Sequence, residues 1–363
     1  MPGRPDTENF RALFLGDVPM MDMRSPGEFT QGAFPTASSL PLMNDAERAE
    51  VGTCYKQRGQ AAAIELGHQL VAGRVRQQRV AAWVAFARAN PQGYLYCFRG
   101  GLRSATVQQW LALEGLDYPL VRGGYKAMRR FLLDNLEQSL AAVEIRLVCG
   151  RTGSGKTRVI EALSRSVDLE GRAGHRGSSF GQLPEGQPSQ IDFENRVSID
   201  LLKLVAAGDA PIYLEDEGRM IGSVHLPPVL RDTMIDAATV VVEESLAERV
   251  TVVLEDYVMD LGRRYAMLYG EDAPQLHRDK LQADLLRIRK RLGGALQQAL
   301  ADRIDAAFEE QWHSGDTSLH RRWIATLLDT YYDPMYDYQL GQRQGAVLFC
   351  GRRDEVIAWA GGP

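Results

Sequence analysis

The segment Gly150-Arg151-Thr152-Gly153-Ser154-Gly155-Lys156-Thr157 is the feature that most constrains the fold of this chain. It follows a short apolar run, residues 145–149, and precedes a stretch that is compatible with a helix. Glycines let consecutive backbone N–H groups turn toward a phosphate, Lys156 adds a mobile positive charge, and Thr157 can offer a hydroxyl to a divalent ion. The sequence therefore predicts a phosphate- or diphosphate-binding loop in an α/β domain, without showing whether the phosphate belongs to a nucleotide. The loop residues expected at the phosphates are Gly150, Gly153, Ser154, Gly155, Lys156 and Thr157.

A second reactive motif lies upstream, around Cys97. This cysteine ends an apolar strand, residues 94–97, and two glycines and a predicted helix over residues 104–113 follow it. Backbone N–H groups can turn toward the sulfur, and the helix adds its positive end. We expect Cys97 to be catalytic inside an anion-binding loop, because the other cysteines lack such surroundings. The loop residues are Phe98, Arg99, Gly100, Gly101, Leu102 and Arg103.

The size and composition of the chain indicate a two-domain protein. It has 363 residues, 45% of them hydrophobic and 25% charged, which is enough apolar material for two cores. No apolar run approaches the roughly 20 residues that a membrane span needs. The N-terminal residues do not resemble an export signal, and the four cysteines are far apart in the sequence. We therefore expect a soluble, cytoplasmic protein with reduced thiols and no membrane association.

The charge balance limits how the chain can bind nucleic acid. The net charge is −5, with +3 over residues 1–140 (16 Lys and Arg against 13 Asp and Glu) and −8 over the remainder. Any RNA contact must therefore use local basic patches. Each candidate could equally be the solvated face of a helix. The candidate residues are Lys126, Arg129, Arg130, Arg287, Lys290 and Arg291.

Alternating strand-like and helical segments predict two α/β domains in tandem. The first covers residues 10–137, a linker covers 138–144, and the second covers 145–350 with a helical region from about 245 to 330. Further buried strands are expected at 211–215 and 239–243. Residues 165–190 are rich in Gly, Ser, Arg and Pro, which favours a long functional loop.

Charged residues of the second domain suggest further contacts with the phosphates. Glu215, Asp216 and Glu217 end a predicted strand, where such domains often place a carboxylate near a metal, although acids at a strand end are also commonly solvated. Arg172, His175 and Arg176 lie in the long loop and could hold a diphosphate or an RNA backbone. Whether a metal binds is left open, and Mg²⁺ is the candidate.

Several motifs of the first half resemble a rhodanese domain. The segments Asp22-Met-Arg-Ser-Pro-Gly-Glu28-Phe29 and Gly32-Ala-Phe-Pro35-Thr-Ala37 carry the resemblance, and Asp22, Arg24 and Glu28 are expected to form ion pairs of the scaffold. The spacing from Cys97 through Arg103 to Ser104 also fits cysteine phosphatases built on a rhodanese-like fold. Against a phosphatase, Tyr96 stands where those enzymes usually have His.

A rhodanese-like domain fused to a P-loop domain resembles the tRNA 2-selenouridine synthase family. Residues 52–59, 96–104, 123–127, 168–178 and 215–217 are similar to that family's motifs, and the resemblance covers about residues 10–350. It implies a fold with an N-terminal rhodanese-like parallel-sheet domain and a P-loop α/β domain with a helical C-terminal region. The last dozen residues match nothing usable.

The resemblance also implies a two-step reaction at the wobble uridine of tRNA. The 2-thiouridine is first geranylated from geranyl diphosphate, and the S-geranyl group is then replaced by selenium from selenophosphate, giving 2-selenouridine. The phosphate loop would hold the diphosphate, and the Cys97 loop would bind selenophosphate, with Cys97 carrying selenium as a selenosulfide. No tightly bound cofactor is expected.

Two other functions remain compatible with the residues. One is a rhodanese-fold cysteine phosphatase fused to a nucleotide-binding domain. The other is a nucleotide-dependent RNA-binding protein or chaperone in which the Cys97 loop is inert. Hydrolysis of a simple aryl phosphate would favour the first, and RNA-stimulated nucleotide hydrolysis that does not depend on Cys97 would favour the second.

Overall fold

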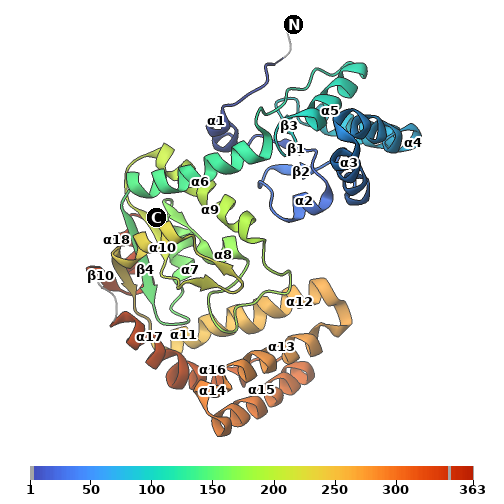
Figure 1. The fold of residues 1–363 in the computed structure, drawn as a ribbon. Coiled ribbons are helices and arrows are strands. Elements are labelled where there is room, and N and C mark those ends of the chain that lie inside the picture. The colour runs from blue at the N-terminus through green and yellow to red at the C-terminus, as the bar shows by residue number, and fades with distance from the viewer. Residues whose placement is uncertain (1–3, 342–344, 363) are drawn as a thin grey trace. The chain divides into compact units, whose positions relative to one another are not determined.

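The computed structural model describes residues 4–341 and 345–362 (Figure 1). The chain forms two compact units. The first contains the residues up to 138 together with 189–203, and the second contains 139–188 and the residues from 204 onward. The predicted first domain, which ends at residue 137, therefore lacks residues 189–203. These residues belong to the first unit although they come later in the sequence.

The first unit is built on a short parallel sheet. Its strands run in the order β2-β1-β3, with Met20 of β1 opposite Ala37 of β2 and Tyr94 of β3. The strands are β1 (Met20–Asp22), β2 (Ala37–Ser39) and β3 (Tyr94–Tyr96). The helices of this unit, two of which continue beyond it, are α1 (Phe10–Leu15), α2 (Pro26–Thr30), α3 (Asp45–Leu70), α4 (Gly73–Ala89), α5 (Leu102–Leu113), α6 (Gly124–Ala142) and α9 (Gln190–Ala207).

Two hydrophobic clusters hold the first unit together. One joins the sheet to α4 and α5 through buried residues such as Trp83 and Trp110. The other joins it to α1, α6 and α9, and includes Met128 and Leu202. The middle of α9 is also tied by a polar contact, since Asn135 Nδ2 donates to the Ser198 carbonyl at 3.0 Å. The predicted helix with Val107, Trp110 and Leu111 as its apolar face is confirmed by their burial.

A five-stranded parallel sheet forms the centre of the second unit. Its order is β10-β9-β4-β6-β5, so the strand that leads into the phosphate loop lies in the middle. The strands are β4 (Ile145–Gly150), β5 (Ser166–Val167), β6 (Ile212–Glu215), β9 (Ala238–Val242) and β10 (Val347–Gly351). A separate antiparallel pair consists of β7 (Met220–Ile221) and β8 (Val224–His225). Ligands of such sheets bind where the strands end, at their carboxyl edge.

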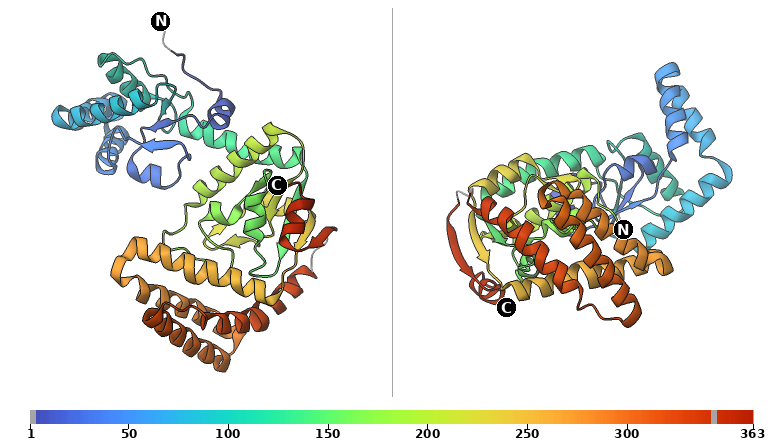
Figure 2. Two further views of the ribbon diagram at one scale, coloured as in Figure 1. Left: turned by 180° about the vertical axis from the view of Figure 1, so that it is seen from behind. Right: turned by 90° about the horizontal axis from the view of Figure 1, so that it is seen from below.

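The helical region of the second unit forms a layer of its own. Helices α12, α13 and α15 pack side by side, and α16 packs on α11 and α15 (Figures 1 and 2). Two π-helical turns, η1 and η3, interrupt the α-helices. The elements are α7 (Lys156–Ala162), α8 (Leu169–Ala173), α10 (Pro228–Ile235), α11 (Leu246–Val253), η1 (Leu254–Asp260), α12 (Leu261–Tyr269), the 3₁₀ turn η2 (Gly270–Asp272), α13 (Ala273–Arg287), α14 (Arg289–Leu292), α15 (Gly294–Ser314), α16 (His320–Leu327), η3 (Leu328–Tyr332), α17 (Asp333–Leu340) and α18 (Arg353–Trp359).

The structure changes three details of the sequence interpretation. Most of the predicted linker 138–144 belongs to α6, which continues to Ala142. The predicted loop 165–190 contains β5 and α8, so only its later part is irregular. The region after residue 350 is part of the second unit, because Val356 of α18 is fully buried against the sheet.

None of the helices among residues 4–341 and 345–362 is both long enough and apolar enough to span a membrane. The fold is thus a mixed α/β structure with parallel sheets in both units. The rhodanese-like character of the first unit stays a prediction.

Candidate functional site

The phosphate loop connects β4 to α7 in the predicted strand–loop–helix order. Gly153 has a φ of 83°, and a Cβ at this position would lie 2.8 Å from the Arg249 carbonyl oxygen, so only glycine fits. The Lys156 ammonium donates a hydrogen bond to the Gly150 carbonyl at 2.9 Å, across the loop. The Ser154 side chain is buried. The loop therefore has the close backbone turn and the central lysine that phosphate binding requires.

A buried arginine fixes the back of the phosphate loop. Arg249 Nε donates to the Thr152 carbonyl at 2.9 Å, and its guanidinium forms a two-pronged ion pair with Asp333, with Nη1 to Oδ2 at 2.9 Å. Arg249 is 2% exposed, so this pair is shielded from water. Arg151 adds a more exposed contact, since its Nη2 lies 2.8 Å from Asp337 Oδ1. The loop is thus anchored to α17, which follows η3.

Carboxylates lie beside the lysine in a cavity of about 320 Å³. Thr157 Oγ1 donates to Glu170 Oε2 at 3.2 Å, and Glu170 and Glu217 interact with each other. Burial raises the pKa of Glu170, although Lys156 opposes this, and burial together with the charge of Glu170 raises the pKa of Glu217 well above its usual value. Two carboxyl groups that share a buried site each disfavour the charged form of the other.

The structure separates the three acids at the end of β6. Asp216 and Glu217 line the cavity, but Glu215 does not. Glu215 is fully buried and accepts a hydrogen bond from the Leu169 amide at 2.8 Å, and burial raises its pKa well above the usual value. Among the described residues, no group of three or more His, Cys, Asp or Glu side chains could hold a metal ion. Glu215 thus has a structural contact behind the site, and the acid/base or metal role of Glu215, Asp216 and Glu217 stays a prediction.

The predicted basic contacts of the long loop divide between two places. Arg176 lines the phosphate-loop cavity, where it forms ion pairs with Asp256 at 3.5 Å and with Asp260 at 2.5 Å. Arg172 is exposed at the end of α8 and lies outside the lining of that cavity. His175 also lies outside it and instead lines a second cavity of about 830 Å³. Of the three, only Arg176 is placed to contact a diphosphate on the loop.

The second cavity brings together residues that are far apart in the sequence. His175 meets Arg287, Lys290 and Arg291 there, and residues 177–179 line this cavity and the phosphate-loop cavity alike. Burial, assisted by the charges of Lys280 and Arg287, lowers the pKa of His175 to about 4. His175 is therefore neutral at pH 7 and cannot supply the positive charge expected of a diphosphate contact.

The spacing of Arg287, Lys290 and Arg291 predicted one continuous helix. The structure instead divides them between two helices. Helix α13 ends at Arg287, and Lys290 and Arg291 belong to the short helix α14. Arg287 bonds to the Ser179 carbonyl at 2.8 Å and to Asp284. Lys290 and Arg291 are exposed and have no ion pair with any residue that the structure describes. These two side chains remain available for phosphate groups.

In the first unit, Cys97 is buried at the end of β3, and the following loop leads into α5. The segment 123–126, singled out in the sequence, supports this loop. The Tyr125 and Lys126 amides donate to the Cys97 and Phe98 carbonyls, each at 2.9 Å. A Cβ on Gly124 would lie 2.2 Å from the Cys97 carbonyl oxygen, so this packing requires glycine.

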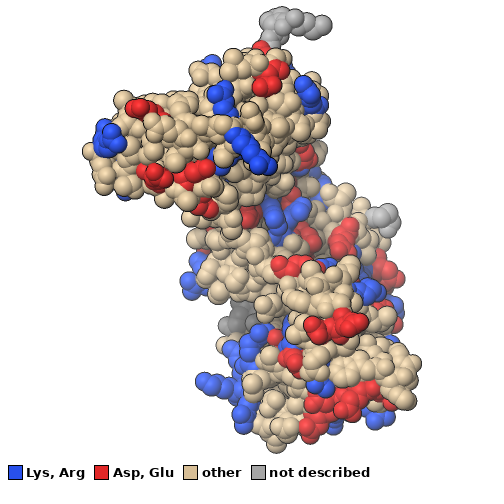
Figure 3. All heavy atoms as spheres, turned by 90° about the vertical axis from the view of Figure 1, so that its right-hand side faces the viewer, with Lys and Arg blue, Asp and Glu red and all other residues tan. Residues whose placement is uncertain are grey.

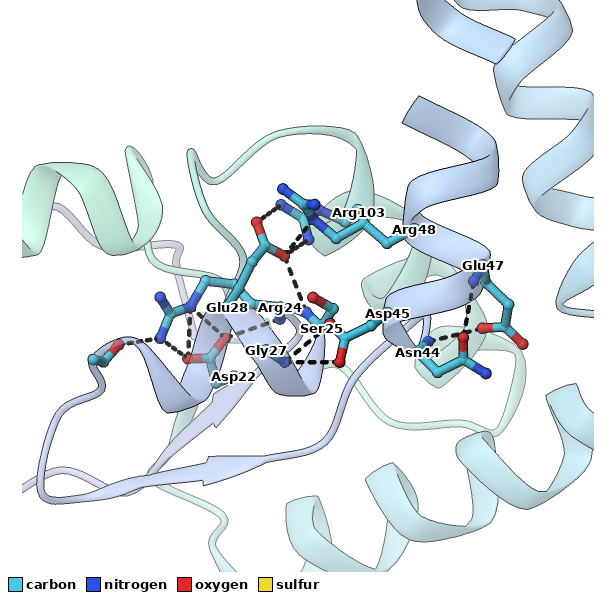
Figure 4. Close-up of polar contacts among 11 residues, drawn as sticks. Asp22, Arg24, Ser25, Gly27, Glu28, Asn44, Asp45, Glu47, Arg48 and Arg103 are labelled. Atoms are coloured by element: carbon cyan, nitrogen blue, oxygen red, sulfur yellow. Dashed lines mark hydrogen bonds and ion pairs between the residues drawn. The ribbon is translucent and has the colours of Figure 1, made fainter. Parts of the chain in front are cut away.

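Arg103 of the Cys97 loop is held by a carboxylate (Figure 4). Its Nη1 and Nη2 lie 2.7 and 3.3 Å from the Glu28 oxygens, and Arg48 Nε lies 3.0 Å from the same group. Burial alone would raise the pKa of Glu28, but the hydrogen bond and charge of Arg103 hold it at about 2. The expected scaffold role of Asp22 and Arg24 is confirmed, since they form a buried pair at 2.7 Å. Glu28 has a further role, because it orients Arg103 of the Cys97 loop.

A cavity of about 820 Å³ adjoins the Cys97 loop. Arg99 and Arg103 of the loop line it, together with Arg48 and Lys56 of α3, and apolar side chains complete the wall. Arg99 is exposed. Four basic groups around one opening can attract an anion to the loop.

The predicted tRNA-binding residues of α6 differ from one another. Arg129 is partly buried and binds Glu194 and Asn195, so it is a structural residue rather than a phosphate contact. Arg130 is exposed and pairs with Asp134 at 3.0 Å, and Lys126 is exposed. Figure 3 shows one face of the molecule, on which acidic side chains are as prominent as basic ones. This face therefore carries no broad basic surface.

Sequence reasoning missed several residues of the phosphate-loop cavity. Glu170 lay inside a family-like motif but had no assigned role, and the cavity residues of the helical region had no recognisable pattern. The sequence could have indicated them only through the Tyr and Met side chains near residues 257 and 332–336. Their spacing is the same as that of ordinary core residues in a helix. The missed residues are Glu170, Asp256, Tyr257, Tyr332, Met335 and Tyr336.

Comparisons with known proteins agree with the motifs. A family model described as the AAA domain of tRNA 2-selenouridine synthase matches residues 143–362. Proteins named tRNA 2-selenouridine synthase are similar over nearly the whole chain. The one from Marinobacter nauticus is 51% identical and covers 99% of this chain and 98% of its own length. Those from Pseudomonas syringae pv. syringae and Alcanivorax borkumensis are 54% and 53% identical, with 98% of this chain covered in each case and 97% and 99% of their own lengths. The resemblance drawn from the motifs is confirmed, and the chain belongs to the tRNA 2-selenouridine synthase family.

Proposed function

We propose that this protein converts 2-thiouridine at the tRNA wobble position into 2-selenouridine through an S-geranyl intermediate. The observation that carries the proposal is the pair of adjoining cavities in the second unit. One contains the phosphate loop with Lys156. The other carries the exposed side chains of Lys290 and Arg291, which form no ion pair with the residues that the structure describes. A diphosphate in the first cavity would thus lie next to a surface suited to RNA phosphates. The names of the relatives, which specify tRNA and selenouridine, support the same reaction.

In the first step, the sulfur of 2-thiouridine attacks C1 of geranyl diphosphate. The C1–O bond breaks, its electron pair goes to the leaving diphosphate, and the uridine N3 proton passes to solvent. Lys156 and the loop amides stabilise the charge that develops on the diphosphate, which is the main electrostatic contribution available here.

Mg²⁺ suits this site as a partner of the diphosphate. The hydroxyl of Thr157 and a carboxylate of Glu170 or Glu217 would hold it, with phosphate oxygens completing its ligands. The absence of a three-residue metal group among the described residues fits an ion that binds mainly through the substrate. When bound, it would supply further positive charge to the leaving group.

In the second step, selenium replaces the S-geranyl group at C2. The Cys97 thiolate adds to C2 and expels geranyl thiolate, which takes a proton from solvent. Selenophosphate then displaces Cys97 through its selenium, and water cleaves the Se–P bond to release phosphate. Selenium has the same oxidation state in selenophosphate and in the product, so this sequence requires no oxidant, whereas loading Cys97 as a selenosulfide would. The exposed Arg99 attracts the selenophosphate anion, while the Arg103–Glu28 pair fixes the shape of the loop.

Mass analysis of wobble nucleosides tests the proposal. Cells that express the chain should contain 2-selenouridine, and cells without the gene should contain only 2-thiouridine derivatives. Purified protein supplied with geranyl diphosphate and 2-thiouridine tRNA, without selenophosphate, should accumulate S-geranyl-2-thiouridine. If neither nucleoside depends on the protein, the proposal is wrong.

A cysteine phosphatase is less well supported. In that chemistry the loop arginine clamps the phosphoryl group, but here both ends of the Arg103 guanidinium bind Glu28. Release of phosphate from an aryl phosphate at a useful rate would favour this alternative.

A further inference from the structure

Part of the wall of the phosphate-loop cavity is apolar and aromatic. The loop and the carboxylates form a polar side, but the helical region contributes side chains that have no use in binding a diphosphate alone. Most of them come from the end of α11 and from η1, η3 and α17. The apolar lining consists of Met220, Val252, Val253, Tyr257, Tyr332, Met335 and Tyr336.

Two π-helical turns meet at this wall. Tyr257 belongs to η1, which spans Leu254–Asp260, and Tyr332 ends η3, which spans Leu328–Tyr332. The wider π-helical turn costs stability relative to an α-helix, and it occurs mostly where a function requires it. Two such turns directed to one cavity indicate that the position of these side chains matters for a ligand.

The apolar wall continues into a narrow crevice between the helices. Val253, Tyr257 and Tyr332 line both the cavity and the crevice. The crevice has a volume of only about 20 Å³, close to that of one water molecule. Thr152 and Ser178 also line both the cavity and the crevice. The residues that line the crevice alone are hydrocarbon and aromatic: Phe180, Trp323, Ile324, Leu327 and Leu328.

The tyrosine hydroxyls at the wall are already engaged. Tyr257 Oη lies 2.8 Å from Ser178 Oγ and 3.2 Å from the Arg176 carbonyl, and burial raises its pKa well above the usual value. Tyr332 is also buried, interacts with Ser178 and Ser179, and has a raised pKa. Both side chains stay neutral, so they contribute mainly their rings to the surface of the cavity.

We propose that this wall and crevice bind the hydrocarbon chain of a prenyl diphosphate whose diphosphate occupies the phosphate loop. The inference rests on the proposed function and assigns the part of the site that sets chain length. Aromatic rings beside C1 would stabilise the positive charge that develops as the C1–O bond breaks. Ile324 and Leu327, which line the crevice, would limit the length of the chain that fits.

The lining favours a prenyl chain over the base of a nucleotide. A purine has several ring nitrogens and, in adenine or guanine, an amino group, all of which require hydrogen-bond partners when buried. The crevice residues beyond the wall, Phe180 and Ile324 among them, have no side-chain groups that could pair with them, except the indole N–H of Trp323. That group donates to His320 Nδ1 at 3.0 Å and is therefore already used.

The test compares two fully buried isoleucines of the helical region. Ile324 lines the crevice, whereas Ile304 lies in the same hydrophobic cluster but outside the lining of the described cavities. The dissociation constants of dimethylallyl, geranyl and farnesyl diphosphate and of inorganic diphosphate are measured for wild type, Ile324→Ala and Ile304→Ala, together with transfer to a 2-thiouridine stem-loop. Thermal melting checks that both variants remain folded.

Wild type should bind geranyl diphosphate at least about ten-fold more tightly than inorganic diphosphate, since each buried CH₂ adds affinity. Ile324→Ala should shift the preference from geranyl toward farnesyl diphosphate by about ten-fold, and Ile304→Ala should not shift it. As a second variant at a half-buried position, Met335→Trp should favour dimethylallyl over geranyl diphosphate.

The outcomes separate the inference from the proposed function. Chain-length effects on binding without any transfer to RNA would support the prenyl site and overturn the geranylation step. Transfer with an unchanged chain-length preference in both Ile324→Ala and Met335→Trp would overturn the prenyl site and leave the reaction standing. Competition by ATP that Ile324→Ala weakens, with no preference for prenyl chains in wild type, would show that a nucleotide occupies the wall instead.

Discussion

Arg249 and Asp333 form a buried ion pair directly behind the phosphate loop, with Arg249 Nη1 2.9 Å from Asp333 Oδ2. The third nitrogen of the guanidinium holds the Thr152 carbonyl at 2.9 Å. The same residue thus connects α11, the phosphate loop and α17. Because Asp333 directly follows η3, this ion pair fixes the position of the phosphate loop relative to the aromatic wall of the cavity.

We expect Arg249→Met to lower stability by roughly 3–5 kcal/mol, because the Asp333 carboxylate would be left without its partner. Diphosphate binding should weaken too. Adding Asp333→Leu should recover much of the stability but not the binding, since the Thr152 carbonyl would still lack its donor. Urea denaturation and diphosphate titration measure the two effects, with Arg231→Met, at an exposed pair with Asp232, as the control. Full recovery of binding in the double variant would mean that Arg249 acts only through stability.

Cys97→Ser should abolish selenium incorporation and leave geranylation largely intact, because geranyl transfer requires no protein thiol. The mutant should accumulate S-geranyl-2-thiouridine, detected by mass analysis of digested tRNA. Cys350→Ser, at an exposed position, serves as the control and should behave as wild type. If tRNA treated with the Cys97→Ser protein contains the normal amount of 2-selenouridine, Cys97 takes no part in the reaction.

Lys156→Ala should show the opposite pattern. Loss of a preorganised charged donor to the leaving diphosphate typically costs on the order of 100-fold in rate. Geranylation should fall by about this factor, while pre-geranylated tRNA should still be selenated if the two steps use separate residues. Single-turnover rates measure both steps, and Lys203→Ala, which loses an exposed contact to Asp17, is the control. An unchanged geranylation rate would assign the loop to another ligand.

Charge reversal at Lys290 and Arg291 should weaken tRNA binding without changing the chemistry of bound tRNA. Each lost phosphate contact should flatten the dependence of log affinity on log salt by roughly one unit. Arg129→Glu is unsuitable for this purpose, because it would place a second acid beside Glu194. Arg231→Glu is the matched exposed control. The test is titration of tRNA at several salt concentrations. If the dependence of log affinity on log salt is the same for wild type and for every variant, the tRNA binds elsewhere.

Acid should destabilise the second unit through His320. Burial, with the charge of His277, lowers the pKa of His320 to about 4, below the usual 6.5. The unfolded chain therefore binds the proton first, so stability is constant above pH 6.5 and falls as pH drops from 6.5 to about 4. The loss through His320 should be roughly 2–4 kcal/mol. The cause is local, because Trp323 Nε1 donates to His320 Nδ1 and a proton there would remove the acceptor.

His320→Gln should reduce the pH dependence of unfolding between pH 6.5 and 4, whatever its effect at pH 7. Urea denaturation across this range measures the slope for wild type and variant. The buried His277 and His175, whose pKa values are also lowered to about 4, should contribute to the dependence that remains, whereas the raised pKa of the buried Glu215 should oppose it. An identical slope in the variant would show that His320 does not titrate on unfolding.

Local patterns predicted the reactive loops because their chemistry is contiguous in sequence. The phosphate loop, the strand ending at Cys97 and the strand at 239–243 all lie where their apolar runs and glycines indicated. The three basic residues at 287–291 line one cavity, although the predicted single helix is divided between α13 and α14.

Contacts between distant segments were beyond such reasoning. Nothing local in Glu28 indicates that it binds Arg103, and nothing in Glu170 indicates that it binds Thr157. The placement of residues 189–203 in the first unit depends on pairs such as Ala33 N with Asp192, at 2.7 Å. These contacts form between residues separated by many positions, so only the folded chain shows them.

The position of β10 and α18 has a consequence for biosynthesis. The parallel sheet gains its β10 strand, and α7 gains its neighbour α18, only from the last residues of the chain. A ribosome must therefore synthesise residues 347–359 before the phosphate loop acquires its final surroundings, and until then the β9 edge lies open. Nascent chains stalled before residue 345 should be good chaperone clients, and a premature stop codon in this stretch would remove the packing around Val356 although every reactive residue had been made.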